Sequence, residues 1–282
     1  MGSISVFQSL WATELRIPGI PELPVCERFD NVKAAGFDGM AIDLGALSLE
    51  TARSAAPHYA RTGLKSLVLA FPRTIEELRA QLVFAKGIGA PFVIVVGQVM
   101  PIAVADMVEV VRAWLALAAE EGMPIQFETH RNCITNDLFS TLQLLEAIPE
   151  MRLSADLSHY VVDREMPCPP PPWMQALVEK VLERSDSFQG RVAARGQIQL
   201  PLGFPQSPKW LDLFLGWWEQ GLRSFASRSE GNAEAVFLCE LGPPDYALTG
   251  ADGHELSDRR AEALLLAQYV RDIWERIQRG AA

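Results

Sequence analysis

The sequence predicts one closed barrel of eight parallel strands and eight helices, a (β/α)8 fold in which residues 1–282 form a single domain. Three observations lead to this prediction. Short β-rich runs alternate with longer helical patterns eight times, which leaves about 35 residues for each strand-helix unit. Several of the runs are apolar throughout, as buried parallel strands are. No linker or low-complexity segment interrupts the alternation, and this favours a closed barrel over an open sheet.

The predicted strands are β-rich runs, of which PFVIVVG (91–97) is the most uniformly apolar. They cover residues 4–10, 37–44, 64–70, 91–97, 124–128, 152–157, 187–193 and 235–241. Between them, Thr74 and Glu77 form a capping-box pattern that begins a helix. Apolar residues recur at helical spacing in 104–115, 210–222 and 264–277. The aromatic stretch 209–221 follows the same period, so we interpret it as core packing.

The composition is that of a globular chain, with 49% apolar and 21% charged residues. A net charge of −10 argues against nucleic acid or an anionic membrane as the main partner, because both reward clustered basic residues. No stretch reaches the ~18 apolar residues of a membrane span, and the first residues do not resemble a signal peptide. The cysteines are widely spaced and predict reduced thiols in a cytoplasmic protein: Cys26, Cys133, Cys168 and Cys239.

Four consecutive predicted strands end in oxygen-bearing side chains. Glu128, Asp156, Gln189 and Glu240 belong to the fifth, sixth, seventh and eighth strands in that order. The carboxyl ends of barrel strands meet at one rim, where such sites lie. Carboxylates in an apolar barrel mouth cost several kcal/mol unless they are paired or bound to a cation. The four positions therefore predict a divalent metal held by hard oxygen ligands.

The segments FETHR, DLSH, QGRV and ELGPPDYA resemble the xylose isomerase-like TIM barrels, which include sugar phosphate isomerases and epimerases. The likeness is close from about residue 124 to 246, and the first half matches in strand rhythm only. It implies that Glu128, Asp156, Gln189 and Glu240 bind the metal. The third ligand is usually His, whereas hydroxypyruvate isomerase-like members carry Gln there, as this chain does. An amide oxygen favours Mg²⁺ or Mn²⁺ over Zn²⁺.

The resemblance also implies contacts with a small-molecule substrate. His159 matches the substrate-binding His of a D-x-x-H unit, and Arg191 and Arg195 follow the third ligand where relatives place a substrate-binding arginine. Further candidates for substrate contact lie beside the predicted rim: His130, Arg131 and Trp11. A homodimer is compatible with the resemblance and with the seven tryptophans.

The predicted function is a divalent-metal-dependent isomerase or epimerase of a small hydroxy-carbonyl compound, either a keto sugar or a hydroxy keto acid. It would proceed through an ene-diolate, with Glu128 and Glu240 as the acid/base pair. The stretch 242–253 contains no Lys or Arg, which disfavours a phosphorylated substrate. Two alternatives remain open: a metal-dependent lyase or dehydratase on the same scaffold, and a barrel that has lost its activity through the change at Gln189.

Overall fold

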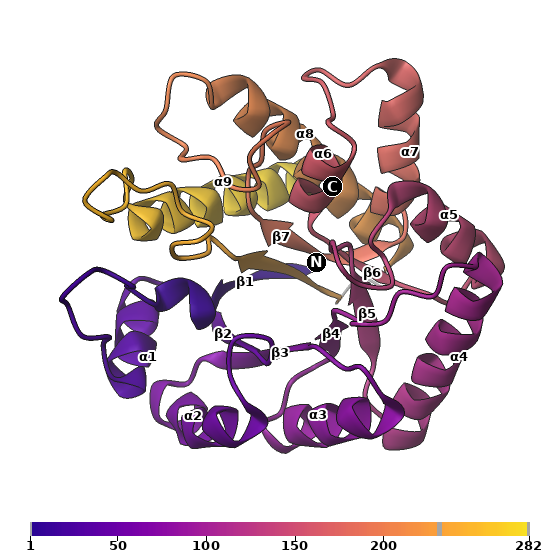
Figure 1. The fold of residues 1–282 in the computed structure, drawn as a ribbon, viewed down its shortest axis with the longest axis horizontal. Helices are drawn as coiled ribbons and strands as arrows, with labels where there is room; N and C mark the ends of the chain where they lie inside the picture. Colours follow the sequence, from indigo (N-terminus) through magenta and orange to yellow (C-terminus); the bar gives the residue numbers. More distant parts are fainter. Residues whose placement is uncertain (1, 230–232, 281–282) are drawn as a thin grey trace.

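The computed structural model describes residues 2–229 and 233–280 and shows a closed barrel of eight parallel strands (Figure 1). Each strand pairs with the next along the chain, and the eighth pairs with the first. The strands are β1 (Ser3–Ser9), β2 (Gly39–Asp43), β3 (Lys65–Ala70), β4 (Val93–Val95), β5 (Ile125–Glu128), β6 (Leu153–Ala155), β7 (Ser185–Gly190) and β8 (Glu234–Cys239). The predicted (β/α)8 barrel is confirmed.

Helices surround the barrel in chain order (Figure 1). The outer helices are α1 (Val25–Ala34), α2 (Leu49–Thr62), α3 (Ile75–Gly87), α4 (Val104–Glu121), α5 (Leu138–Ala147), α7 (Pro172–Leu182), α8 (Pro208–Arg228) and α9 (Arg259–Gly280). Two short helices directly follow strands: η1 (Trp11–Thr13) after β1 and α6 (Leu157–Asp163) after β6. Within the described ranges, no helix combines the length and the apolar character that a bilayer crossing needs.

The helices form where the local sequence predicts them. Thr74 caps α3 by accepting a hydrogen bond from the backbone N–H of Glu77, and the Glu77 carboxylate accepts one from the N–H of Arg73. The aromatic stretch becomes α8, which buries an apolar stripe against the strands as core packing: Trp210, Phe214, Trp217, Trp218 and Phe225. The sequence pattern therefore identified both the start of a helix and the face that another helix buries.

Several strands are shorter than predicted: β4 covers three residues of the predicted 91–97 and β6 three of the predicted 152–157. The last two strands are also shifted along the chain. The seventh covers Ser185–Gly190 rather than 187–193, and the eighth covers Glu234–Cys239 rather than 235–241. Val192 and Ala193 are fully buried, yet they lie beyond the strand. Apolar residues indicate burial, but they do not indicate which residues pair with a neighbouring strand. The predicted boundaries of these two strands therefore lie too far toward the C-terminus. As a result, Arg191 and Glu240 occupy the loops that directly follow their strands.

Side chains that point into the barrel form their own small core. It consists of Phe7, Ala41, Leu67, Leu69, Ile94, Val236 and Leu238. Alternate residues of a strand face the same side of the sheet, so the next inward positions toward the carboxyl end lie two residues further on. These positions are Asp43 after Ala41 and Glu240 after Leu238. The small apolar core inside the barrel is thus followed by acidic side chains at the barrel mouth.

Candidate active site

A cavity of about 280 Å³ opens at the carboxyl ends of the strands, the usual place for the active site of such a barrel. Segments that follow seven of the eight strands contribute to its wall. The lining residues are Trp11, Arg16, Asp43, Gly45, Ala46, Phe71, Gln98, Glu128, His130, Arg191, Glu240 and Tyr246. The lining thus combines acids, arginines and aromatic rings.

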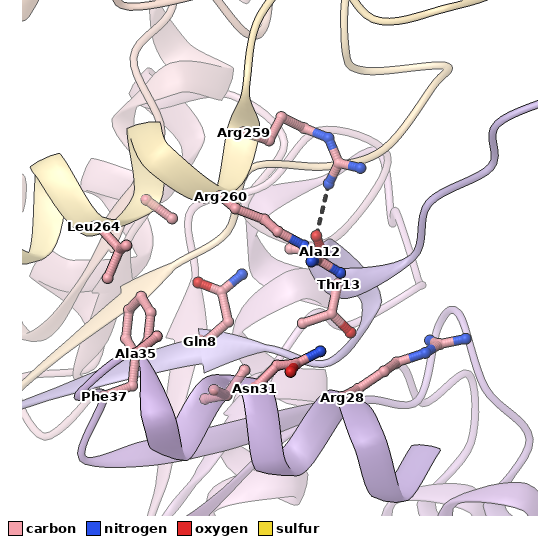
Figure 2. Close-up of a pocket in the computed structure, with 12 residues that line it drawn as sticks. Gln8, Ala12, Thr13, Arg28, Asn31, Ala35, Phe37, Arg259, Arg260 and Leu264 are labelled. Atoms are coloured by element: carbon pink, nitrogen blue, oxygen red, sulfur yellow. Dashed lines mark hydrogen bonds between the residues drawn. The ribbon is translucent and has the colours of Figure 1, made fainter. Parts of the chain in front are cut away.

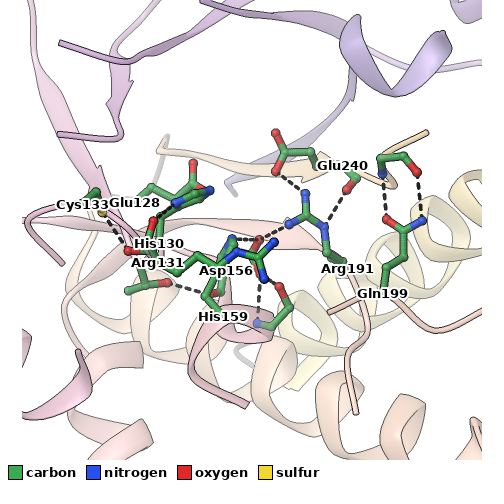
Figure 3. Close-up of polar contacts among 12 residues, drawn as sticks. Glu128, His130, Arg131, Cys133, Asp156, His159, Arg191, Gln199 and Glu240 are labelled. Atoms are coloured by element: carbon green, nitrogen blue, oxygen red, sulfur yellow. Dashed lines mark hydrogen bonds and ion pairs between the residues drawn. The ribbon is translucent and has the colours of Figure 1, made fainter. Parts of the chain in front are cut away.

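Three carboxylates lie close together, and two of them, Glu128 and Glu240, line this cavity (Figure 3). Glu128 ends β5, Asp156 caps the N-terminus of α6, and Glu240 directly follows β8. Each offers an oxygen, and the three oxygens lie within 4.8 Å of one another. All three side chains are buried, with at most 4% of any residue exposed. The structure therefore brings together the three acids that the sequence singled out.

Arg191 lies between two of these acids. Its Nη1 donates to Asp156 Oδ2 at 3.1 Å and its Nη2 donates to Glu240 Oε2 at 2.9 Å, while Nε donates to the Glu240 carbonyl at 3.0 Å. The guanidinium also lies 4.9 Å from the centre of the Tyr246 ring. The sequence predicted that Arg191 contacts the substrate. In the structure it lines the cavity, but its hydrogen bonds run to the acids.

The single positive charge of Arg191 does not neutralise the three carboxylates of this cluster. Burial raises the pKa of Glu128 well above its usual range, and the nearby carboxylates of Glu240 and Asp156 raise it further. Burial also raises the pKa of Glu240 to about 8, although Arg191 opposes that shift. If all three acids ionised, three negative charges would face one positive charge. A divalent cation would supply the two charges that are missing.

Several buried polar atoms of the cluster lack partners. Gln189 lies on β7, two residues before Arg191, and neither Oε1 nor Nε2 of its amide has a hydrogen-bond partner among the described residues. The same holds for Glu128 Oε2. Buried polar groups are rarely left unpaired, so these atoms are available to a ligand, and the Gln189 amide lies near enough to Glu128 to lower the pKa of that carboxyl. Three carboxylates and an amide oxygen form a hard donor set that fits Mg²⁺ or Mn²⁺.

Two histidines form the adjoining wall, with their ring centres 4.0 Å apart. Burial lowers the pKa of His130 to about 4 and that of His159 well below its usual range, so both rings are neutral at pH 7. His159 Nε2 lies 3.4 Å from Asp156 Oδ2. Neither ring nitrogen of His159 has a hydrogen-bond partner in the described part of the chain. Both histidines and Glu128 also form a second group that could hold a metal.

The rim places Trp11 edge-on against Tyr246, with ring centres 5.1 Å apart. Trp11 also packs on Gly242, where a Cβ would lie 2.4 Å from the indole, so this contact requires glycine. Gln199 fixes Gly242 through a pair of hydrogen bonds, accepting from its N–H at 2.7 Å and donating to its carbonyl at 3.0 Å. Arg131 lies over the same Tyr246 ring, 5.5 Å from its centre. Tyr246 is therefore contacted by the ring of Trp11 and by the guanidinium of Arg131.

Of the residues named as substrate contacts, Trp11, His130 and Arg191 line the cavity, and Arg195 lies outside it. Its side chain is 62% exposed and pairs with Glu165 at 3.0 Å. The loop after β7 turns away directly after Arg191, so the second arginine of the stretch does not reach the carboxylates.

No family model and no curated protein sequence matches the chain. Solved structures do. A xylose isomerase-like TIM barrel protein from Mycobacterium smegmatis in complex with magnesium is 16% identical, with a TM-score of 0.63 over 97% of this chain and 100% of that one. The chain has a xylose isomerase-like TIM-barrel fold.

Two more structures share this fold. A D-allulose 3-epimerase from Methylomonas is 13% identical, with a TM-score of 0.61 over 97% of this chain and 99% of that one. The probable 3-DHS dehydratase AsbF from Bacillus anthracis is 15% identical, with a TM-score of 0.55 over 94% and 99%. The solved structures that share the fold of this chain thus include an epimerase and a probable dehydratase.

Sequence reasoning missed Asp43 in this xylose isomerase-like barrel. Asp43 ends β2 and lines the cavity, and it accepts hydrogen bonds from the backbone N–H groups of Gly45 and Ala46 at 2.6 and 3.1 Å. Burial raises its pKa to about 6, and its charge in turn raises the pKa of Glu240. The signal was present, since Asp43 lies near the carboxyl end of the predicted strand 37–44, as Glu128 does in the predicted strand 124–128.

We expect the metal-free protein to lose stability between pH 6.5 and 8. In this range Glu240 is protonated in the folded state, where its pKa is about 8, and ionised in the unfolded chain. A raised folded pKa gives stability that is lost as pH rises through it. The expected loss is about 1–2 kcal/mol, measured by urea denaturation in EDTA. Excess Mg²⁺ should flatten the dependence, and a metal-free protein equally stable at both pH values would contradict these shifts.

Proposed function

We propose that the protein is a divalent-metal-dependent isomerase or epimerase of a small hydroxy-carbonyl compound, a keto sugar or a hydroxy keto acid. The observation that carries this proposal is the cluster of three buried carboxylates beside the unpartnered amide of Gln189. A cluster that needs two more positive charges, placed at the mouth of a barrel, suits a metal and a carbonyl substrate. The epimerases of the same fold support the proposal.

Glu128, Asp156, Gln189 and Glu240 would hold the metal. A bound divalent cation stabilises the negative charge that develops on substrate oxygens when a neighbouring C–H proton is removed. These four residues were proposed from the sequence; the three acids offer oxygens within 4.8 Å of one another, and Glu128 and Glu240 line the cavity, which supports the proposal. Arg191 holds the carboxylates of Asp156 and Glu240 in place through its Nη1 and Nη2 atoms.

Glu128 and Glu240 would move the proton. They belong to strands three positions apart in the barrel, so they reach a bound substrate from different sides. One carboxylate takes the proton from the carbon next to the carbonyl and leaves an ene-diolate. The other returns a proton to the opposite face of that carbon in an epimerisation. In an isomerisation, the proton goes to the former carbonyl carbon. The neutral rings of His159 and His130 would hydrogen-bond a substrate hydroxyl.

The charge of the cavity favours an unphosphorylated substrate. Its lining contains three acids, Asp43, Glu128 and Glu240, and two arginines, Arg16 and Arg191. Arg191 donates to Glu240, and Arg16 pairs with Glu14 at 2.9 Å and donates to the Pro244 carbonyl, which leaves the rim residue Arg131 for a single carboxylate or for hydroxyl groups. A dianionic phosphate would add repulsion from the acids. Turnover of phosphorylated sugars at least tenfold faster than that of free sugars and keto acids would contradict this assignment.

The dehydratase of the same fold supports one alternative reaction. An enolate formed by the same proton removal can lose a β-hydroxyl instead of regaining a proton. Mass spectrometry of the product separates the two reactions, because an isomerase or epimerase conserves mass and a dehydratase releases water. The third reading, a barrel without activity, predicts neither product.

The test of the metal site uses Mn²⁺ binding followed by electron paramagnetic resonance, with Mg²⁺ as competitor. We expect Asp156→Asn to weaken Mn²⁺ binding by at least about 100-fold, because it removes one carboxylate of the oxygen set. His130→Gln should change it by less than about tenfold, because His130 belongs only to the second group. The opposite pattern would assign the metal to the histidines, and absence of Mn²⁺ binding at millimolar concentration would contradict the proposed function.

A further inference from the structure

A second cavity, of about 260 Å³, lies on the outer side of β1 between α1 and α9 (Figure 2). None of its lining residues lines the cavity at the barrel mouth. The ring of helices around the barrel is loosest here: α1 and α9 are neighbours in this ring but make little direct contact, whereas α1 packs on α2 and α8 packs on α9. The cavity therefore lies where α1 and α9 leave a gap in the ring of helices.

The lining of this cavity is apolar at its base and basic at its edge. Apolar surface comes mainly from Val32, Ala35, Phe37, Ala263 and Leu264, and the arginines are Arg28, Arg259 and Arg260. No acid is present among the twelve lining residues. In a chain with a net charge of −10, a cavity with three arginines and no carboxylate is locally favourable to an anion.

The three arginines differ in how many ion pairs and hydrogen bonds their guanidinium groups make. Arg28 lies 3.4 Å from a carboxylate oxygen of Glu22, and Arg259 pairs with Glu255 at 2.7 Å. Arg259 also donates to backbone carbonyls on both sides of the cavity, including that of Ala12 (Figure 2). The Arg260 guanidinium makes no ion pair or hydrogen bond with any residue that the structure describes. Arg260 is therefore the cation available to a ligand.

Gln8 gives the cavity a buried polar group without a partner. It lies on β1 and points toward the space between α1 and α9 (Figure 2). Only 6% of the residue is exposed, and its Oε1 has no hydrogen-bond partner among the described residues. A buried carbonyl oxygen without a hydrogen-bond donor destabilises the folded protein. A ligand that brings an O–H or N–H to this atom would remove that destabilisation.

We propose that this cavity is a second binding site, for a small amphipathic carboxylate that carries a hydrogen-bond donor. Its apolar body lies between α1 and α9 against Phe37 and Leu264. Its hydroxyl or amide N–H donates to Gln8 Oε1, and its carboxylate pairs with Arg260. The volume suits a molecule built on one ring. The site is independent of the metal and substrate proposed for the barrel mouth.

The test uses three one-ring probes that differ by one group each. The probe 3-(4-hydroxyphenyl)propanoate carries both polar groups, 3-phenylpropanoate lacks the hydroxyl, and 4-ethylphenol lacks the carboxylate. Isothermal titration calorimetry on the full chain should show saturable binding of the first at or below about 10 mM. The other two should bind at least tenfold more weakly.

Two variants assign the preferences to their residues. In Gln8→Leu the first two probes should bind equally, because the acceptor assigned to the hydroxyl is removed. In Arg260→Gln the first and third should bind equally, because the cation is lost. Arg279→Gln, an exposed arginine of the same helix, is the matched control and should leave all three affinities unchanged. Gln8→Leu should also melt at the same or a higher temperature than the parent, since it removes an unpartnered amide.

Two results would overturn the proposal. If none of the probes saturates below about 10 mM, the oxygen of Gln8 is served by an ordered water and the cavity is not a ligand site. If the probes bind but neither variant changes their relative affinities, they bind elsewhere. Metal binding at the barrel mouth should be the same in all variants, so failure here is distinct from failure of the proposed function.

Discussion

Replacement of either glutamate of the proposed acid/base pair, as Glu128→Gln or Glu240→Gln, is expected to lower kcat by about 10²- to 10⁴-fold. Each change removes one partner of the proposed proton transfer and one metal ligand, while the amide keeps the shape of the side chain. The fold should survive, because burial raises the pKa of both carboxyls and already favours their neutral form when no metal is bound. The measurement is steady-state turnover of the best keto sugar or keto acid in saturating Mg²⁺.

The matched control is Glu150→Gln, an exposed glutamate, which should leave kcat unchanged. Both active-site variants should retain the unfolding midpoint of the parent in EDTA, which separates loss of catalysis from loss of fold. A variant at Glu128 or Glu240 that keeps more than about a tenth of the parent kcat would remove that residue from the acid/base pair.

Arg191→Met is expected to have the largest effect on stability, a loss of about 3–5 kcal/mol in metal-free protein. Arg191 is 2% exposed and is the guanidinium that contacts both Asp156 and Glu240, so its removal leaves two buried acids without their counter-ion. Urea denaturation in EDTA measures the loss. Excess Mg²⁺ should restore part of it, because a cation held by the same acids replaces the missing charge.

The control for this variant is Arg276→Met. Arg276 pairs with Glu219 at the same 2.9 Å as Arg191 with Glu240, but its side chain is 49% exposed, so the expected change is below about 1 kcal/mol. Equal losses in the two arginine variants would show that burial of the cluster does not set its energetics, and would weaken the argument for a missing divalent charge.

The sequence was sufficient for the barrel and for the convergence of its acids. Alternation of strand and helix is a local property, and the rule that strand ends meet at one rim carries Glu128, Asp156, Gln189 and Glu240 to one place. The same rule holds for Asp43, which lies at the end of the second strand and lines the cavity, although the prediction did not name it. These residues were predictable because strand position alone determines where they point.

Other features depend on packing that no local pattern records. Arg191 and Arg195 look alike in the sequence, yet one is buried between two acids and the other pairs with Glu165 at the surface. Which arginine turns inward depends on the path of the loop after β7. The cavity beside Gln8 depends on the spacing of α1 and α9, helices from opposite ends of the chain.

The central claim is that the carboxylate cluster, with a divalent cation, removes a proton next to a substrate carbonyl. Deuterium incorporation tests it most directly. The protein is incubated in D₂O with Mg²⁺ or Mn²⁺ and a panel of unphosphorylated keto sugars and hydroxy keto acids, and the carbon next to the carbonyl is followed by NMR. We predict that deuterium enters there in at least one compound, and that EDTA or Glu128→Gln abolishes the exchange. Exchange that persists in EDTA, or none with any compound, would contradict the account.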